Sequence, residues 1–248
     1  MAAVTQFFPN YAAALAACGS GYNDADIADV IAYKTALALD PRVPLPDQVI
    51  NTIVSLGVAA AEVSERPLTV LDYGGGCGFH YFRAIPMFRT ALRWAIVETP
   101  VMAERAAKLG RGRFDVFTDL ETAAATLGRI DLVHASGVIP YVPNPPAALK
   151  ELASLRPRYF LLARFPVWRG ATRVGLQSSF LSENGIGPMP PGVPDRQVEF
   201  PVTFVNFDDA MEAFAGYGLV SVLGSPSGAY EVNGHHLEAV TLLFRLQG

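Results

Sequence analysis

From Pro67 onward the sequence alternates short apolar runs with segments of helical character, and this alternation is the feature that most constrains the fold. Each run is almost entirely apolar and rich in β-branched or aromatic residues, as expected of strands that are buried on both faces. Strands that alternate with helices predict βαβ units and a mostly parallel sheet. The final two runs are close enough in sequence to pair antiparallel. The expected strands are Leu68–Leu71, Leu92–Val97, Phe114–Phe117, Ile130–Val133, Tyr159–Phe165, Leu219–Leu223 and Leu237–Leu246.

The residues before this alternation predict a different organisation. Residues 1–66 contain three stretches with helical periodicity: the Ala-rich Tyr11–Cys18, a stretch after Asn23 and Asp24, and one after Pro46. We therefore expect an N-terminal helical cap over 1–66 and an α/β domain over 67–248. Within that domain, residues 166–207 are rich in proline and too long for an ordinary connection. They predict an insertion that covers a substrate.

Composition excludes several classes of protein. Apolar residues make up 51% of the chain and charged residues 17%, which excludes disorder, and no apolar run approaches the ~18 residues of a membrane helix. The N-terminus lacks the basic start of a signal peptide, and the two cysteines form neither a disulfide framework nor a zinc-ligand set. The formal net charge of −4 disfavours nucleic-acid binding. We expect a cytoplasmic protein without a metal, acting on a small molecule; its oligomeric state is open, and a homo-oligomer is one outcome.

The strongest local signal is a glycine-rich turn at the end of the first expected strand. After Asp72, glycines occupy alternate positions, at Gly74, Gly76 and Gly78. Glycine lets the backbone approach a ligand and adopt positive φ, although a tight strand-to-helix turn alone would also explain the pattern. A dinucleotide fingerprint would need its third glycine at Phe79. The carboxylate of Asp72 suits a ligand with a cationic amino-acid part and would repel a pyrophosphate.

The next two expected strands also end in acids. Glu98 ends the second strand, twenty residues after Gly78, where a ribose-binding carboxylate is found in βαβ nucleotide sites. A solvated glutamate at a strand end is the alternative interpretation. The third strand is followed by Asp119 and Leu120, which offer an acceptor for an exocyclic amine and an apolar wall for a purine.

Together these features resemble the class I S-adenosylmethionine-dependent methyltransferases over about residues 67–165. The resemblance is carried by the acid-x-Gly-x-Gly-x-Gly turn from Asp72, by Glu98 and Asp119, and by the segment 131–142. More narrowly, the chain is similar to an orphan group of bacterial methyltransferases, through Gly21-Tyr22, Leu71–Gly76 with Tyr81-Phe82, Ser136–Val138 and Arg158–Phe160. The resemblance implies a Rossmann-like, seven-stranded, mostly parallel sheet with an antiparallel last strand.

The same resemblance implies S-adenosylmethionine (SAM) as cofactor and assigns residues to it. Glu98 would hold the ribose, Asp119 and Leu120 the adenine, and Ser136 would lie beside the sulfonium through its backbone. Thr99, next to Glu98, belongs to the same set. Pro86 departs from the family pattern because it shortens the helix after the glycine turn. The methionine part would be held by Asp72, Tyr73, Gly74, Gly75, Gly76 and Gly78.

Catalysis then depends on the methyl acceptor. Methyl transfer needs an aligned nucleophile and exclusion of water, and it needs a general base only when the acceptor is protonated. His134 and Tyr141 flank the expected methyl position and are the candidate bases; a histidine hydrogen-bonded in the core is the alternative for His134. The aromatic residues of Tyr159–Phe207 favour an apolar or aromatic acceptor, methylated at oxygen or nitrogen. A non-catalytic cofactor-binding subunit and an NAD-type oxidoreductase are the alternatives.

Overall fold

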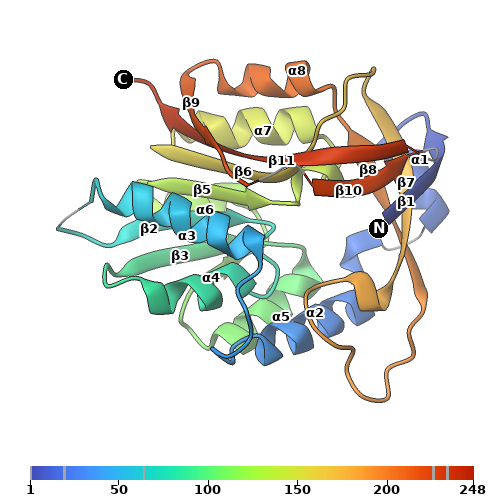
Figure 1. The fold of residues 1–248 in the computed structure, drawn as a ribbon, viewed down its shortest axis with the longest axis horizontal. Coiled ribbons are helices and arrows are strands. Elements are labelled where there is room, and N and C mark those ends of the chain that lie inside the picture. The colour runs from blue at the N-terminus through green and yellow to red at the C-terminus, as the bar shows by residue number, and fades with distance from the viewer. Residues whose placement is uncertain (1, 19–20, 64, 225–226, 233–234) are drawn as a thin grey trace.

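The computed structural model describes residues 2–18, 21–63, 65–224, 227–232 and 235–248. The strands of these residues form one sheet in the order β4-β3-β2-β5-β6-β11-β10-β1-β7-β8, and β9 pairs with β11 on its other edge. One half of this sheet carries helices on both faces, and the other half projects beyond it (Figure 1).

The central half consists of the strands expected from the sequence. Five run parallel, and β11 and β9 are antiparallel to their neighbours, so the Rossmann-like α/β fold with N-terminal helices is confirmed. The apolar runs become strands because their side chains are buried on both faces of the sheet. The bounds are β2 (Leu68–Tyr73), β3 (Leu92–Val97), β4 (Asp115–Phe117), β5 (Leu132–Ser136), β6 (Tyr159–Pro166), β9 (Tyr217–Val222) and β11 (His235–Leu246).

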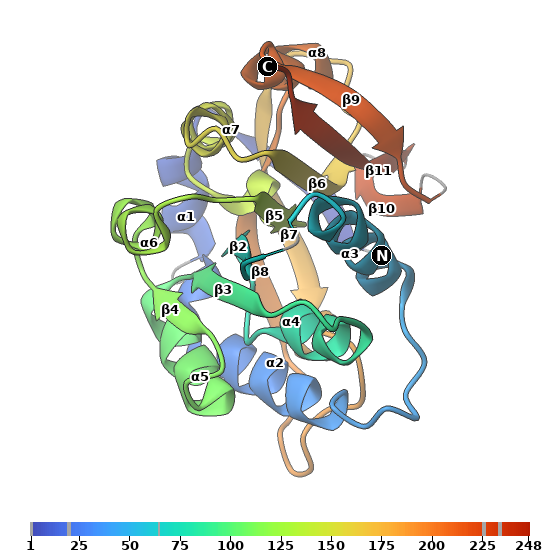
Figure 2. The same cartoon turned by 90° about the vertical axis from the view of Figure 1, so that its left-hand side faces the viewer.

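Helices cover both faces of the central half, with two separate hydrophobic cores between them and the sheet (Figure 2). On one face lie α3 (Asp47–Ala60), α4 (Phe79–Ala84) and α5 (Pro100–Gly110), with α2 (Ala25–Leu37) packed on α5. On the other face lie α6 (Leu120–Leu127), α7 (Pro145–Ser154) and α8 (Phe207–Met211). Short 3-10 helices are η1 (Gly21–Asn23), η2 (Ile85–Met87), η3 (Ile139–Tyr141), η4 (Leu181–Glu183) and η5 (Glu212–Phe214).

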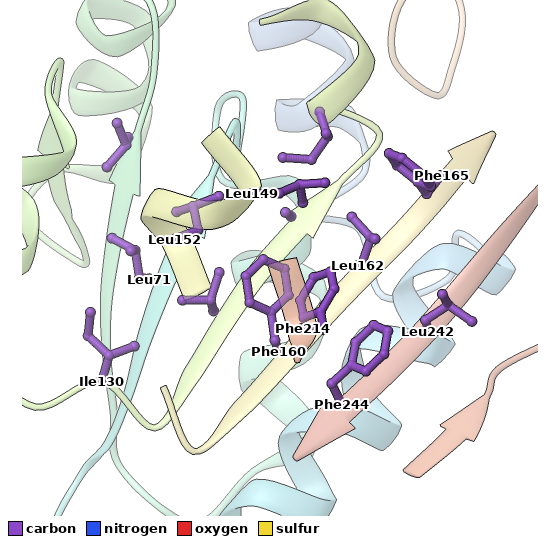
Figure 3. Packing of buried hydrophobic residues seen from close by; sticks show 14 of the residues in the cluster. Leu71, Ile130, Leu149, Leu152, Phe160, Leu162, Phe165, Phe214, Leu242 and Phe244 are labelled. Carbon is purple, nitrogen blue, oxygen red and sulfur yellow. The ribbon is translucent and has the colours of Figure 1, made fainter. Parts of the chain in front are cut away.

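The core on the α6–α8 face is built around aromatic rings from distant parts of the chain. Phe214 stacks on Phe244 of β11 with ring centroids 4.2 Å apart and meets Phe160 of β6 edge-on at 4.9 Å. Leu149 and Leu152 of α7 close this core from above the sheet (Figure 3). Such burial, at roughly 25 cal/mol per Å² of apolar surface, holds β6 and β11 against α7 and η5.

The other half of the sheet, which we call the extension, was not predicted. It consists of β1 (Ala2–Phe8), β7 (Arg173–Phe180), β8 (Gln197–Phe204) and β10 (Ser227–Val232). The prediction that residues 1–66 are helical is therefore wrong for β1, whereas the three helices predicted after it are present, with α1 at Tyr11–Cys18. The strand forms because β1 pairs in parallel with β10 and antiparallel with β7, and such long-range pairing overrides local propensity.

The expected insertion at 166–207 contains the antiparallel hairpin of β7 and β8, paired in register from Arg173↔Phe204 to Phe180↔Gln197. Residues Gln177 and Phe200 are opposite each other in this hairpin and therefore share one face. That face packs against η3, which directly follows β5, so the extension meets the carboxyl edge of the central half. Among the described helices, none is long and apolar enough to cross a membrane.

Candidate functional site

The glycine-rich turn joins β2 to α4, and its glycines are required by backbone geometry. Gly74, Gly76 and Gly78 have φ of 69°, 57° and 82°, a region that side chains disfavour. A Cβ at Gly74 would lie 2.2 Å from a methyl carbon of Val138, and one at Gly75 would lie 2.4 Å from Oδ2 of Asp72. The turn is therefore packed closely between the strand-end carboxylate and the segment after β5.

Glu98 ties this turn to the end of β3. Its Oε1 accepts a hydrogen bond from the backbone N–H of Gly76 at 2.9 Å, and its Oε2 accepts one from the N–H of Thr99 at 2.9 Å. Burial raises the pKa of Glu98 to about 6, and these two N–H donors oppose that rise. The carboxylate thus lies beside the turn in the position predicted for a ribose ligand.

Two buried hydroxyls near the turn lack a hydrogen-bond partner within the part of the chain that the structure describes. They belong to Thr99, after β3, and Ser136, at the end of β5. Because β2 lies between β3 and β5 in the sheet, these hydroxyls flank the glycine turn. A buried polar group without a partner is costly, so it favours a ligand with donors and acceptors of its own at this edge. The site therefore fits a polar cofactor.

Asp119 lies farther along the same edge. Its Oδ1 accepts a hydrogen bond from the N–H of Thr122 at 2.8 Å, so the residue caps α6, and it is exposed. Leu120 is half-buried against the core. The backbone N–H of Glu98 donates to Phe117 O at 3.0 Å, which joins the ends of β3 and β4. The contact of Asp119 and Leu120 with adenine stays a prediction.

Asp72 lies in a buried polar network that the sequence did not predict. Its Oδ1 is 2.7 Å from Nδ1 of His134, and its Oδ2 accepts from the indole N–H of Trp94 at 3.2 Å. The hydroxyl of Thr52 on α3 is 3.0 Å from Nε2 of His134 and 2.8 Å from Nδ1 of His80. Asp72 and His134 are register partners on neighbouring parallel strands, which brings them to the same face.

This network uses both oxygens of Asp72 and both ring nitrogens of His134. Burial, followed by the charge of His134, holds the pKa of His80 well below its usual value, so His80 is neutral. The only sequence signal for the network was histidine within an apolar strand. Thr52 and Trp94 gave no signal because their role depends on how α3 and β3 pack.

Tyr141, the other predicted base, belongs to a second network on η3. Its hydroxyl donates to Oε1 of Gln177 at 2.8 Å and lies 3.1 Å from the hydroxyl of Tyr230. Burial raises the pKa of Tyr141 far above its usual value, so the phenol is protonated at neutral pH. Tyr22 meets the Tyr141 ring edge-on at 4.9 Å and stacks on Phe200 at 4.1 Å. The predicted site residues therefore divide between a glycine-turn edge and an aromatic wall, which consists of Tyr22 on η1, Tyr141 on η3 and Phe200 on β8 of the extension.

Arg164 of β6 was also missed by sequence reasoning. It has φ of 56°, although it lies inside a strand, and its Nη2 donates to Ser136 O at 2.9 Å. Its guanidinium lies against Gly137, where a Cβ would be 2.3 Å from Nη2. No composition or periodicity marks this position, because the unusual backbone arises from sheet pairing.

Residues 47–164 match a family model described as a methyltransferase domain. The match begins inside the predicted N-terminal cap, at the start of α3, and the division at residue 66 stays a prediction. No curated protein matches the chain.

Among solved structures, similarity is found to the N-terminal domain of EvdMO1 with S-adenosylhomocysteine (SAH) bound. The TM-score is 0.51 and the identity 16%, covering 82% of each chain. The fold is also similar to that of a SAM-dependent methyltransferase from Clostridium acetobutylicum, at TM-score 0.53 and 12% identity, covering 84% of this chain and 94% of the other. At these identities the similarity concerns the fold, and the narrower resemblance to an orphan group stays a prediction. Residues 47–164 thus match a methyltransferase domain, and the fold of the chain is that of the class I SAM-dependent methyltransferases.

Proposed function

We propose that this chain transfers a methyl group from SAM to a small-molecule acceptor, at oxygen or nitrogen. The observation that carries the proposal is the link between the glycine turn and the strand-end carboxylate, in which the N–H of Gly76 donates to Glu98 at 2.9 Å. A ribose bound at Glu98 would lie directly beside a turn whose backbone is open to a ligand: a Cβ on Gly76 would have a single neighbour, 3.8 Å away.

Each group of residues at this edge is assigned to one part of the cofactor. Glu98 would accept hydrogen bonds from the ribose hydroxyls, and Asp119 with Leu120 would contact the adenine. Tyr73 and the glycine turn would hold the methionine part, and the unpaired hydroxyls of Thr99 and Ser136 supply further hydrogen bonds. When bound there, SAM supplies an electrophilic methyl group on a positively charged sulfonium.

The buried networks indicate positioning roles for the two candidate bases. His134 has both ring nitrogens bonded and is fully buried, so in our proposal it holds Asp72 and the glycine turn in place. The Tyr141 hydroxyl donates its hydrogen bond to Gln177 and has a strongly raised pKa, so in our proposal Tyr141 stays protonated, shapes the aromatic wall and does not remove a proton. The nucleophile is therefore expected to react without a strong protein base.

A small-molecule acceptor agrees with the aromatic wall of Tyr22, Tyr141 and Phe200 and with the net charge of −4. The N-terminal domain of EvdMO1, at TM-score 0.50 and 16% identity, was crystallised in the presence of SAH and D-fucose. We place the reaction in the cytoplasm, where the two cysteines, free in this structure, would stay reduced.

Calorimetric titration with S-adenosylhomocysteine (SAH) and with NAD tests the cofactor. We expect binding of SAH alone, and the reverse result would overturn the proposal. Glu98→Ala should weaken SAH binding by about 1.5–3 kcal/mol, because charged hydrogen bonds to ribose are lost. Glu104→Ala is the matched control, since Glu104 is an exposed carboxylate on α5 paired with Lys108.

Methyl transfer itself is measured with SAM labelled in its methyl group against a panel of hydroxylated and aminated small molecules. A labelled product is the expected result. SAH binding without transfer to any acceptor would favour the non-catalytic binding subunit.

A further inference from the structure

The backbone of Arg164 is strained in a way that only the surrounding sheet maintains. A non-glycine residue with φ of 56° inside a strand is rare, and its neighbours Ala163 and Phe165 are both buried while Arg164 is exposed. The register between β6 and β11 breaks between Val240 and Leu242, and the N–H of Arg164 donates to the hydroxyl of Thr241 at 3.3 Å. Strain of this kind is concentrated at functional sites, where it aims a side chain.

The strained backbone directs the guanidinium across the carboxyl end of β5. There its Nη2 donates to Ser136 O at 2.9 Å. The guanidinium lies so close to Gly137 that a Cβ on Gly137 would be 2.3 Å from Nη2. Gly137 itself has φ of 69°, so two neighbouring segments are adapted to this placement. Ser136 is the residue predicted to lie beside the sulfonium, and Arg164 therefore lies at the methyl-transfer end of the site.

The charge of Arg164 is uncompensated. Among the residues that the structure describes, no carboxylate forms an ion pair with it, and Ser136 O is the one acceptor found for its five guanidinium donors. Its positive charge acts on Tyr22, Tyr141 and Tyr230, where it opposes the rise in pKa caused by burial. A guanidinium fork that lacks a carboxylate partner suits an oxygen anion of a ligand.

We propose that Arg164 binds a carboxylate or phosphate group of the methyl acceptor, whose ring lies against the tyrosines of the aromatic wall. The proposal rests on the methyltransferase function proposed above and adds the substrate class, an anionic ring compound. The acceptor is favoured over the cofactor as the ligand of Arg164 because β5 lies between β6 and the strand that leads into the glycine turn, whereas β6 contacts η3, which carries Tyr141, and β10, which carries Tyr230.

Binding of simple anions tests this directly. Benzoate and phenyl phosphate are titrated into the protein saturated with SAH, with benzyl alcohol as the uncharged match. We expect at least one anion to bind, and benzyl alcohol to bind at least tenfold more weakly than that anion. The anion that binds more tightly shows whether Arg164 prefers a carboxylate or a phosphate. Equal binding of the charged and uncharged probes, or no binding of either anion, would overturn the proposal.

Substitution then separates the acceptor from the cofactor. Arg164→Gln should lower the affinity for the bound anion at least tenfold and change the affinity for SAH less than twofold, whereas Arg173→Gln, an exposed arginine over the ring of Phe7, should change neither. A tenfold loss of SAH affinity in Arg164→Gln would assign the residue to the cofactor and overturn the proposal. Failure of the natural protein to bind SAH would instead refute the proposed function.

Arg164→Gly tests whether the residue is structural. Glycine adopts φ of 56° without strain, so this variant should unfold at the same temperature as the natural protein or higher, and it should still lose anion binding. A markedly lower melting temperature with anion binding retained would show that Arg164 supports the sheet and would overturn the proposal.

Discussion

The two halves of the sheet differ in how their strands find each other. In the central half, β2, β3, β5 and β6 are parallel neighbours joined by helices, and each strand is a buried apolar run. In the extension, β1 pairs with β10 and β7, which come from distant parts of the chain. The predicted cofactor residues belong to the central half, whereas Phe200 of the aromatic wall and the two hydrogen-bond partners of Tyr141, Gln177 and Tyr230, belong to the extension. A fold shared with other methyltransferases thus carries the cofactor side, and an addition to it shapes the acceptor side.

The buried networks of the two halves give the largest expected contrast. Asp72→Ala removes a buried carboxylate from His134 and Trp94 and should cost about 3–4 kcal/mol of unfolding free energy, because it leaves polar groups without partners. Tyr141→Phe removes one hydroxyl from the extension network and should cost about 1 kcal/mol. Urea unfolding measures both. Equal costs would show that the Asp72 network has no special structural weight.

Substitution of a glycine in the glycine turn by alanine should be more destabilising than the same substitution at a glycine elsewhere with a similar φ. Gly74→Ala combines φ of 69° with a contact of 2.2 Å to Val138 and should cost about 2–3 kcal/mol and weaken SAH binding. Gly112→Ala has φ of 76° with no neighbour within 4 Å, so it isolates the backbone cost, about 1 kcal/mol. Calorimetric SAH titration and thermal unfolding of both variants are the measurements. A similar loss in both would mean that close packing adds nothing at Gly74.

The pH dependence of cofactor affinity should come from the central half. Because burial raises the pKa of Glu98 to about 6 and ribose needs the carboxylate, SAH affinity should fall as pH falls through 6, by up to about tenfold per unit below it. The same shift makes the folded state bind a proton more readily than the unfolded one, so the contribution of Glu98 to stability increases as pH falls between 6 and 4.5. Affinity and stability should therefore change in opposite directions. SAH titrations from pH 5 to 8 check the first, and Glu98→Gln should abolish the step.

The smallest effects concern one unpaired hydroxyl in each half. Ser136 and Thr203 both have a buried hydroxyl without a partner among the described residues, and Thr203 borders a cavity of about 470 Å³ near α1. Ser136→Ala and Thr203→Val should each raise the unfolding free energy by up to about 1 kcal/mol. Only Ser136→Ala should weaken SAH binding, by about 0.5–1.5 kcal/mol. Weaker binding in Thr203→Val would contradict the division of roles between the two halves.

Sequence reasoning succeeded where structure depends on local pattern. The predicted and observed bounds of β3 are the same, Leu92–Val97. A short, mostly apolar run between two helices is typical of a buried strand. The side chains of Asp24 and Asn144 cap α2 and α7, and such caps can be predicted because they depend on neighbouring residues only. The glycine turn could be predicted for the same reason.

Sequence reasoning failed where structure depends on pairing between segments that are distant in the chain. The contact between Asp72 and His134 follows from strand register, which the sequence does not state. The strain at Arg164 lies where the pairing of β6 with β11 shifts register, with Ala163 and Arg164 opposite Thr241 alone. β1 is an apolar stretch whose partners lie more than a hundred residues away. Each of these features is determined by tertiary packing and cannot be predicted from local propensity.

The pairing of β1 also affects the order in which the molecule can assemble. Its residues 2–4 pair with residues 230–232 and its residues 3–8 with residues 174–178, so β1 gains its full set of partners only after both of these distant segments are in place. Closing so long a loop is slow, whereas the βαβ units of the central half form from neighbouring segments. We therefore expect a nascent chain to acquire its cofactor edge first, and the acceptor wall to close as a late step of folding.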